Sequence, residues 1–173
     1  MITLITGGSK CGKSRYAEKI LEGFQGRKFY IAAMKPFGAD ALEAIERHRL
    51  LRSGKGFETI EKYTDIGELS LPPGCGVLVE CIGNLCANEM FQGRTVQSCS
   101  EKILSGIKAL TVNAAETVIV TNQVGADGVP YPEGTAEYIS ELGAINTGIA
   151  ALADNVVECV YGIPVILKGG RPC

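Results

Sequence analysis

The sequence contains no tryptophan and a single histidine among its 173 residues, and aromatic residues make up 6% of the chain. No apolar run approaches the roughly 18 residues that a membrane helix needs, so we expect no membrane span. The net charge of −2 is too small to draw nucleic acid or an anionic membrane to the whole surface. We therefore expect no nucleic-acid binding, and a polyanionic ligand would need a local site.

The chain also lacks a paired cysteine framework. Its seven cysteines are an odd number, and no C-x-x-C pair occurs among them. Met1 to Thr6 is too short for a signal-peptide core and has no basic lead-in. We therefore expect reduced thiols and a cytoplasmic location. A metal site at Cys81 and Cys86 would need four ligands at suitable spacing, and the sequence does not have them. We therefore interpret both cysteines as small residues of the core.

The chain length and the 46% apolar content predict one domain, residues 1–173, with a full core. Short apolar runs alternate with segments that have helical periodicity, which predicts an α/β fold with a mostly parallel sheet and helices on both faces. The predicted strands are Ile2–Thr6, Lys28–Ala32, Phe57–Glu61, Gly76–Glu80, Thr117–Thr121, Val156–Val160 and Pro164–Lys168. The predicted helices are Lys13–Phe24, Ala41–Leu51, Asn84–Phe91, Val96–Ala115 and Thr135–Ala153. In the second of these we expect Asp40 as the N-cap and Leu42 and Ile45 to face inward.

A phosphate-binding P-loop joins the first predicted strand to the first predicted helix. It fits G-x-x-x-x-G-K-[ST] at all its fixed positions and consists of Gly7, Gly8, Ser9, Lys10, Cys11, Gly12, Lys13 and Ser14. This geometry aims backbone N–H groups and a helix N-terminus at phosphate oxygens. Lys13 would reach the β- and γ-phosphates of a nucleoside triphosphate, and the Ser14 hydroxyl could bind Mg²⁺.

Two further residues are candidates for chemistry. Glu80 ends a buried apolar strand, where many P-loop proteins have an acid that holds Mg²⁺, although a charged residue at a strand end is common without that role. His48 lies among Arg47, Arg49 and Arg52, which suits an anion, and a neutral imidazole is a competent nucleophile toward phosphorus. The alternative is a surface or core histidine on a solvated helix face.

Several segments together resemble the bifunctional adenosylcobinamide kinase / adenosylcobinamide-phosphate guanylyltransferase family. The most specific is His48-Arg49-x-x-Arg52 followed by Phe57-x-Thr59-Ile60-Glu61. The other segments are Ile5–Arg15 with Ala17-Glu18, Tyr30–Ala32, Leu78–Cys81 with Asn88, Val120–Gly125 with Val129-Pro130, and Asn146 with Ala150–Asp154. They span nearly the whole chain.

This resemblance implies a RecA-like P-loop NTPase fold, a homotrimer, and two reactions in cobalamin biosynthesis. A nucleoside triphosphate, ATP or GTP, would first phosphorylate adenosylcobinamide, with Mg²⁺ as cofactor. GTP would then donate GMP to adenosylcobinamide phosphate through a guanylylated histidine, which corresponds to His48. The resemblance also implies that the nucleotide site is lined by Ala33, Met34, Lys35, Leu50, Leu51, Arg52, Ser53, Glu61 and Glu80.

Three other functions are compatible with the same core. A plain small-molecule kinase would need no covalent intermediate and therefore no His48. A regulatory or motor ATPase would normally use a partner's arginine and often a nucleic-acid face, which the slightly acidic composition disfavours. A module that binds GTP without turning it over would not need Lys13, Ser14 and Glu80 together.

Overall fold

A seven-stranded sheet forms the centre of the molecule, with the strand order β3-β2-β4-β5-β1-β6-β7. The computed structural model describes residues 1–36, 38–91 and 98–170. The strands are β1 (Ile2–Thr6), β2 (Lys28–Ala32), β3 (Phe57–Glu61), β4 (Cys75–Glu80), β5 (Ala114–Val120), β6 (Asn155–Val160) and β7 (Ile163–Lys168). All neighbouring strands pair in parallel except β6 and β7, which are antiparallel. The predicted mostly parallel α/β fold is confirmed.

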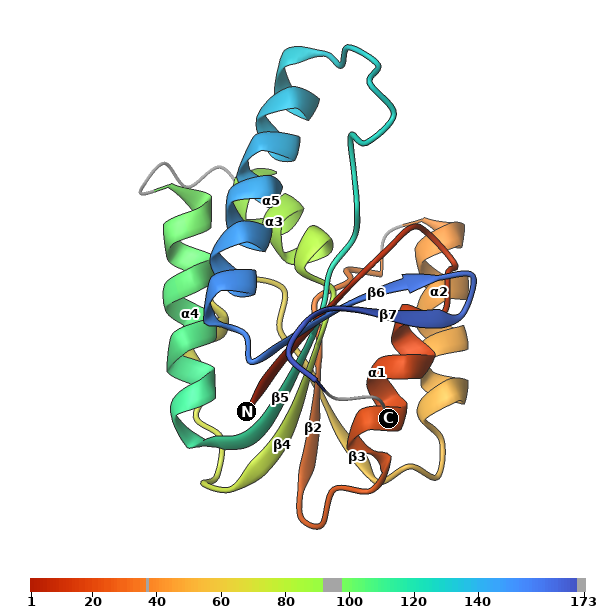
Figure 1. The fold of residues 1–173 in the computed structure, drawn as a ribbon, viewed down its shortest axis with the longest axis vertical. Coiled ribbons are helices and arrows are strands. Elements are labelled where there is room, and N and C mark those ends of the chain that lie inside the picture. Colours follow the sequence, from red (N-terminus) through yellow and green to blue (C-terminus); the bar gives the residue numbers. More distant parts are fainter. Residues whose placement is uncertain (37, 92–97, 171–173) are drawn as a thin grey trace.

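Helices cover both faces of this sheet (Figure 1). They are α1 (Lys13–Glu22), α2 (Ala39–Arg52), α3 (Ile82–Phe91), α4 (Cys99–Asn113) and α5 (Glu133–Leu152), with a short 3₁₀ turn η1 at Ile66–Glu68. α1 and α2 lie on one side of the sheet, and α3, α4 and α5 lie on the other. None of the helices in the described part of the chain is long and apolar enough to cross a membrane.

Two separate apolar clusters fill the space between the sheet and these helices. Val77 and Val79 of β4 pack into the cluster under α3, α4 and α5, whereas Leu78 packs with Ala17 and Leu21 of α1. Successive side chains of a strand point to opposite faces, so a strand covered on both sides is buried at every position. This explains why β4 is buried along its whole length.

The parallel pairing brings the carboxyl ends of the central strands to one edge. Glu80 at the end of β4 is in register with Ala32 of β2 on one side and with Val120 of β5 on the other. Ala32 is in turn in register with Glu61 of β3. Ligands of open α/β sheets bind at this edge, and the P-loop after β1 opens onto it.

Several details of the predicted helices are wrong, and one is that the first helix ends at Glu22 and not at Phe24. Asp40 lies inside α2, which begins after Gly38, so it is not the N-cap. Leu42 does not face inward, because 55% of its surface is exposed. The fourth helix ends at Asn113, since Ala114 already pairs with β4 as the first residue of β5. The predicted start of that helix at Val96 falls outside the described residues.

The contact between α4 and η1 depends on two glycines and gives a stability test. A Cβ on Gly106 would lie 2.9 Å from Cγ1 of Ile66 and 3.0 Å from the backbone nitrogen of Gly67. Gly106→Ala should therefore lower the free energy of unfolding by about 1–3 kcal/mol, as expected for overpacking. Gly143→Ala, in α5 with no atom within 4 Å of its Cβ, should instead leave stability unchanged or raise it by up to about 1 kcal/mol. Urea unfolding of both variants is the measurement, and equal effects would contradict the close contact.

Candidate functional site

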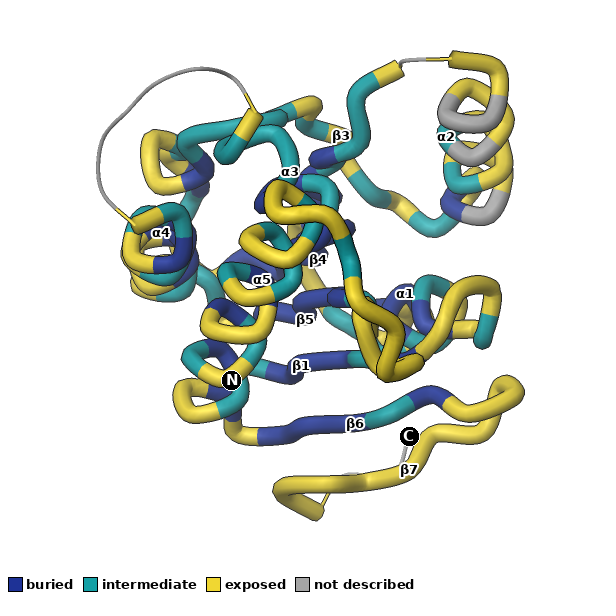
Figure 2. Tube along the Cα trace, turned by 90° about the horizontal axis from the view of Figure 1, so that it is seen from above, coloured by how far each residue is buried: buried dark blue, intermediate teal, exposed yellow. Residues whose placement is uncertain are grey.

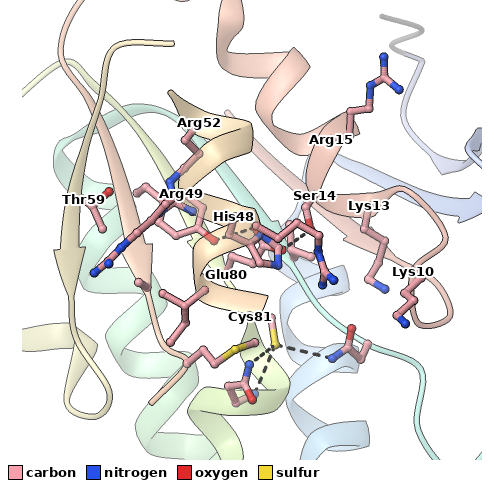
Figure 3. Close-up of a pocket in the computed structure, with 18 of the residues that line it drawn as sticks. Lys10, Lys13, Ser14, Arg15, His48, Arg49, Arg52, Thr59, Glu80 and Cys81 are labelled. Carbon is pink, nitrogen blue, oxygen red and sulfur yellow. Dashed lines mark hydrogen bonds and ion pairs between the residues drawn. The ribbon is translucent and has the colours of Figure 1, made fainter. Parts of the chain in front are cut away.

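A cavity of about 820 Å³ opens at the carboxyl edge of the sheet. Its walls come from the P-loop, the ends of β2 to β5, helix α2 and the start of α3. Figure 3 shows His48 and Glu80 at its centre, with Ser14 and Lys13 on the P-loop side and Arg49, Arg52 and Thr59 opposite. The P-loop and the histidine-bearing helix therefore face the same space.

The P-loop conformation requires glycine at its first position. Gly7 has φ +142°, and a Cβ there would lie 2.5 Å from the carbonyl oxygen of Cys159 in β6. Gly12 precedes α1 with φ +99°. Both conformations are ones that residues with a Cβ rarely adopt. The loop thus wraps closely against the sheet and leaves the first N–H groups of α1 directed at the cavity.

The ammonium group of Lys13 lies inside this loop. Its Nζ donates to the carbonyl oxygens of Gly7 at 2.9 Å and Gly8 at 2.5 Å, and the side chain is 7% exposed. These partners are dipoles rather than carboxylates, so the positive charge stays available to an anion in the cavity. This is the arrangement expected of a lysine that neutralises phosphate.

Glu80 connects three different elements through its carboxylate. Ser14 Oγ from the start of α1 donates to Oε1, and the Tyr30 hydroxyl from β2 donates to Oε2 at 3.0 Å. His48 Nδ1 from α2 lies 3.7 Å from Oε1. Glu80 is 8% exposed, and a buried carboxylate of this kind requires such partners.

The same pair of oxygen donors suits Mg²⁺. The Ser14 hydroxyl and the Glu80 carboxylate already converge on each other, and Mg²⁺ prefers oxygen ligands, with waters and phosphates completing its shell. The described residues contain no cluster of three or more His, Cys, Asp or Glu side chains that could hold a metal ion. Within that part of the chain, protein side chains alone would therefore not complete the coordination of a metal. Ser14 and Glu80 therefore fit a magnesium ion that arrives with a nucleotide.

His48 is largely enclosed at this point, with 16% of its side chain exposed. Its Nδ1 is buried and has no hydrogen-bond partner among the described residues. Of the arginines around it, Arg49 is 3.3 Å from Glu61, and the guanidinium of Arg52 lies 3.5 Å from the ring centre of Tyr30. The charged group that the imidazole approaches is the Glu80 carboxylate, 3.7 Å from Nδ1.

The structure brings most of the predicted site residues together. The cavity is lined by Ser9, Lys10, Cys11, Gly12, Lys13, Ser14, Met34, His48, Arg52, Glu61 and Glu80. Ala33 is buried behind the wall and donates its N–H to the Glu80 carbonyl at 2.9 Å. Outside the lining lie Gly7, Gly8, Lys35, Leu50 and Ser53, and Leu50 is 68% exposed. The side chain of Leu51 is not among the described ones.

Sequence reasoning gave no site role to several lining residues, of which Tyr30 is the most important. Tyr30 is almost fully buried, and burial followed by the charge of Glu80 raises the pKa of its phenol well above the usual value. Asn84 and Asn122 also line the cavity, and their amides donate to Cys81 Sγ at 3.1 and 3.6 Å. The sequence did contain a signal for Tyr30. It lies in a predicted strand that is covered on both faces, and a buried hydroxyl there needs a hydrogen-bond partner.

Comparison with known proteins agrees with this geometry. The model of the cobinamide kinase / cobinamide phosphate guanyltransferase family matches residues 3–167. The chain is 31% identical to the bifunctional adenosylcobalamin biosynthesis protein CobU of Escherichia coli (strain K12), with 97% of this chain and 100% of that protein covered. It is 26% identical to the bifunctional adenosylcobalamin biosynthesis protein CobP of Pseudomonas aeruginosa, with 98% of both covered.

Solved structures extend the comparison to the fold alone. An ATPase from the type III secretion system of pathogenic bacteria superposes with a TM-score of 0.55 at 12% identity and covers 95% of this chain and 56% of that one. A protein of Pyrococcus horikoshii OT3 superposes with a TM-score of 0.54 at 9% identity, covering 98% and 87%. The expected RecA-like P-loop NTPase fold is confirmed.

The buried phenol of Tyr30 predicts a pH dependence of stability. The folded protein keeps this phenol protonated, whereas the unfolded chain releases the proton near pH 10, so the unfolded state binds fewer protons and stability falls as pH rises above 10. Tyr30→Phe should remove this contribution, so the free energy of unfolding should fall less steeply with pH, by at most about 1.4 kcal/mol per pH unit. Urea unfolding between pH 8 and 11 is the measurement. Tyr161→Phe, at a side chain that is 95% exposed, is the control and should keep the wild-type slope.

Proposed function

The chain belongs to the cobinamide kinase / cobinamide phosphate guanyltransferase family, and we propose that one domain and one P-loop cavity carry out both of its reactions. The protein is accordingly a bifunctional transferase of adenosylcobalamin biosynthesis that uses GTP and ATP as nucleotide substrates. The observation that carries the one-cavity proposal is that His48 lies beside Glu80, which is itself hydrogen-bonded to Ser14 of the P-loop.

The kinase step would use the P-loop side of the cavity. Lys13 would leave the carbonyl oxygens of Gly7 and Gly8 and bind the β- and γ-phosphates of the nucleotide. Ser14 and Glu80 would hold Mg²⁺, which supplies charge neutralisation at the phosphates when bound. The hydroxyl of adenosylcobinamide would attack the γ-phosphorus, and the bond to the β-phosphate oxygen would break.

The guanylyltransferase step would use His48 as the nucleophile. Because Nδ1 lies 3.7 Å from Glu80, Nε2 would be the nitrogen that the imidazole presents to the α-phosphorus of GTP. A bond forms between Nε2 and phosphorus while the bond to the pyrophosphate oxygen breaks, and Lys13 stabilises the departing pyrophosphate. The phosphate of adenosylcobinamide phosphate then attacks the same phosphorus and restores the free imidazole, giving adenosyl-GDP-cobinamide.

The base and ribose of the nucleotide would lie along the far wall. This wall includes Met34, Arg52 and Glu61, which line the cavity. Ala33, Lys35, Leu50, Leu51 and Ser53 are assigned to the same part of the site on the family resemblance alone. The position of Glu61 at the end of β3 and of Arg52 at the end of α2 supports this assignment.

Association into a homotrimer is also part of the proposal. The β6–β7 edge of the sheet is apolar and open, because Tyr161 is 95%, Ile163 65% and Leu167 58% exposed. Exposed apolar surface of this kind is typical of a protein–protein interface.

A cytoplasmic location is proposed on the six described cysteines, all of which are free thiols.

Covalent labelling tests the central claim. Incubation with Mg²⁺ and GTP labelled at the α-phosphorus, without corrinoid, should leave acid-labile label on the denatured protein, whereas γ-labelled GTP should leave none. His48→Ala should abolish this label but keep nucleotide binding and much of the kinase activity. Undiminished guanylyltransferase activity in His48→Ala would overturn the covalent mechanism.

The magnesium assignment makes a separate prediction. Ser14→Ala removes one of the two oxygen donors, so the Mg²⁺ concentration that half-saturates the kinase step should rise by on the order of tenfold. Ser70→Ala, an exposed serine outside the cavity, is the matched control and should titrate like the wild type. An unchanged Mg²⁺ requirement in Ser14→Ala would remove this residue from the site.

A further inference from the structure

A buried ion pair connects α1 to the turn after the histidine-bearing helix and takes no part in the chemistry proposed above. Glu18 of α1 is fully buried, and its Oε2 is 2.6 Å from Nζ of Lys55, whose side chain is 25% exposed. Neither residue lines the cavity. Burying a carboxylate costs free energy, so surface solubility does not explain why this ion pair is present.

Lys55 belongs to the turn that directly follows α2. Its N–H donates to the Arg52 carbonyl at 3.0 Å, and Ser53 N–H donates to the Leu50 carbonyl at 3.2 Å, so the turn continues the hydrogen bonding of the helix end. A contact that fixes Lys55 therefore also fixes the last turn of α2. His48 lies four residues before Arg52, which is one helical turn away.

A second contact fixes the same helix end. The guanidinium of Arg52 stacks 3.5 Å from the ring centre of Tyr30, and Tyr30 donates its hydroxyl to Glu80. Together with the Glu18–Lys55 pair, these contacts form one cluster of charged and aromatic side chains around the end of α2. The cluster thus connects α1, β2 and β4 to the end of α2.

Apart from the Arg49–Glu61 ion pair and the approach of His48 to Glu80, the described side chains of helix α2 make little other attachment. Among its described side chains Arg52 is the buried one, Ile45 and His48 are half-buried, and Leu42 and Leu50 are 55% and 68% exposed. Figure 2 shows the helix standing apart from the sheet with mostly exposed residues. Most surface helices are held by an apolar stripe, and the described side chains of α2 do not form one, so we take its polar contacts to decide where it sits.

We propose that Glu18 and Lys55 are positioning residues for guanylyl transfer, which hold the end of α2 against α1 and so place His48 over Glu80. This inference rests on the proposed role of His48. Binding of the triphosphate chain by the P-loop does not depend on the pair, because the loop is held by β1, β6 and the start of α1. The base and ribose side of the site, at Arg52, would move with the end of α2. Misplacing a nucleophile by about 1 Å can cost on the order of 100-fold in rate.

The test separates the rate of guanylylation from triphosphate affinity. Lys55→Met should slow labelling from α-labelled GTP by roughly tenfold or more, with a Kd for inorganic triphosphate, which the P-loop alone would bind, within about threefold of the wild type. Lys55→Arg should restore labelling to within about threefold, because it keeps the charge. Lys62→Met is the matched control: Lys62 is also 25% exposed and pairs at 2.8 Å, but with Glu68, which is 71% exposed. It should label like the wild type.

A second variant keeps the test decisive if Lys55→Met fails to fold with Glu18 left unpaired. Glu18→Gln combined with Lys55→Met removes both charges, should fold, and should still label slowly. Wild-type labelling in Lys55→Met, or a loss of triphosphate affinity as large as the loss of rate, would overturn the positioning role. An unlabelled wild-type protein would instead overturn the proposed function, and this inference with it.

Discussion

The carboxylate of Glu80 is the group around which the rest of the site is arranged. It stands at the end of β4, which is buried on both faces, so the charge can leave the apolar interior only where the strand ends. A carboxylate in that position must be hydrogen-bonded, and the hydroxyls of Ser14 and Tyr30 meet this need from the P-loop helix and the neighbouring strand. His48 then approaches the same oxygen as Ser14. One buried charge therefore fixes the relation between the phosphate loop and the histidine.

The two sides of the site are held by different kinds of interaction. The P-loop side rests on close packing, with Gly7 against β6 and the apolar face of α1 against β4 and β5. Close-packed elements resist displacement, which suits a loop that must present fixed N–H groups to phosphates. The histidine side rests on polar contacts at the end of α2, which are directional but few. Because such contacts hold position without burying much apolar area, the placement of His48 depends on individual side chains more than that of Lys13 does.

Local patterns in the sequence predicted the elements that bury apolar surface. Strand β4 and the P-loop follow from short-range signals, a continuous apolar run and fixed glycine spacing, so both were found where expected. The orientation of α2 was missed because Leu42 and Leu50 are apolar but exposed, which makes the helical periodicity misleading. The contact of Tyr30 with Glu80 and of Glu18 with Lys55 depends on which strands and helices become neighbours. Such long-range pairing leaves no periodic signal in the chain.

The charge distribution explains how a slightly acidic protein can hold a polyanion. The cavity is lined by Lys10, Lys13, Arg15, Arg47, Arg49 and Arg52 against the carboxylates of Glu61 and Glu80, although the whole chain has a net charge of −2. The rest of the surface is therefore more acidic than the net charge indicates. A nucleoside triphosphate is repelled by that surface and attracted at the carboxyl edge of the sheet, where low-dielectric walls strengthen the field. Since Lys13 is bound to carbonyl oxygens and Arg52 to an aromatic face, neither charge is cancelled by a carboxylate before the nucleotide arrives.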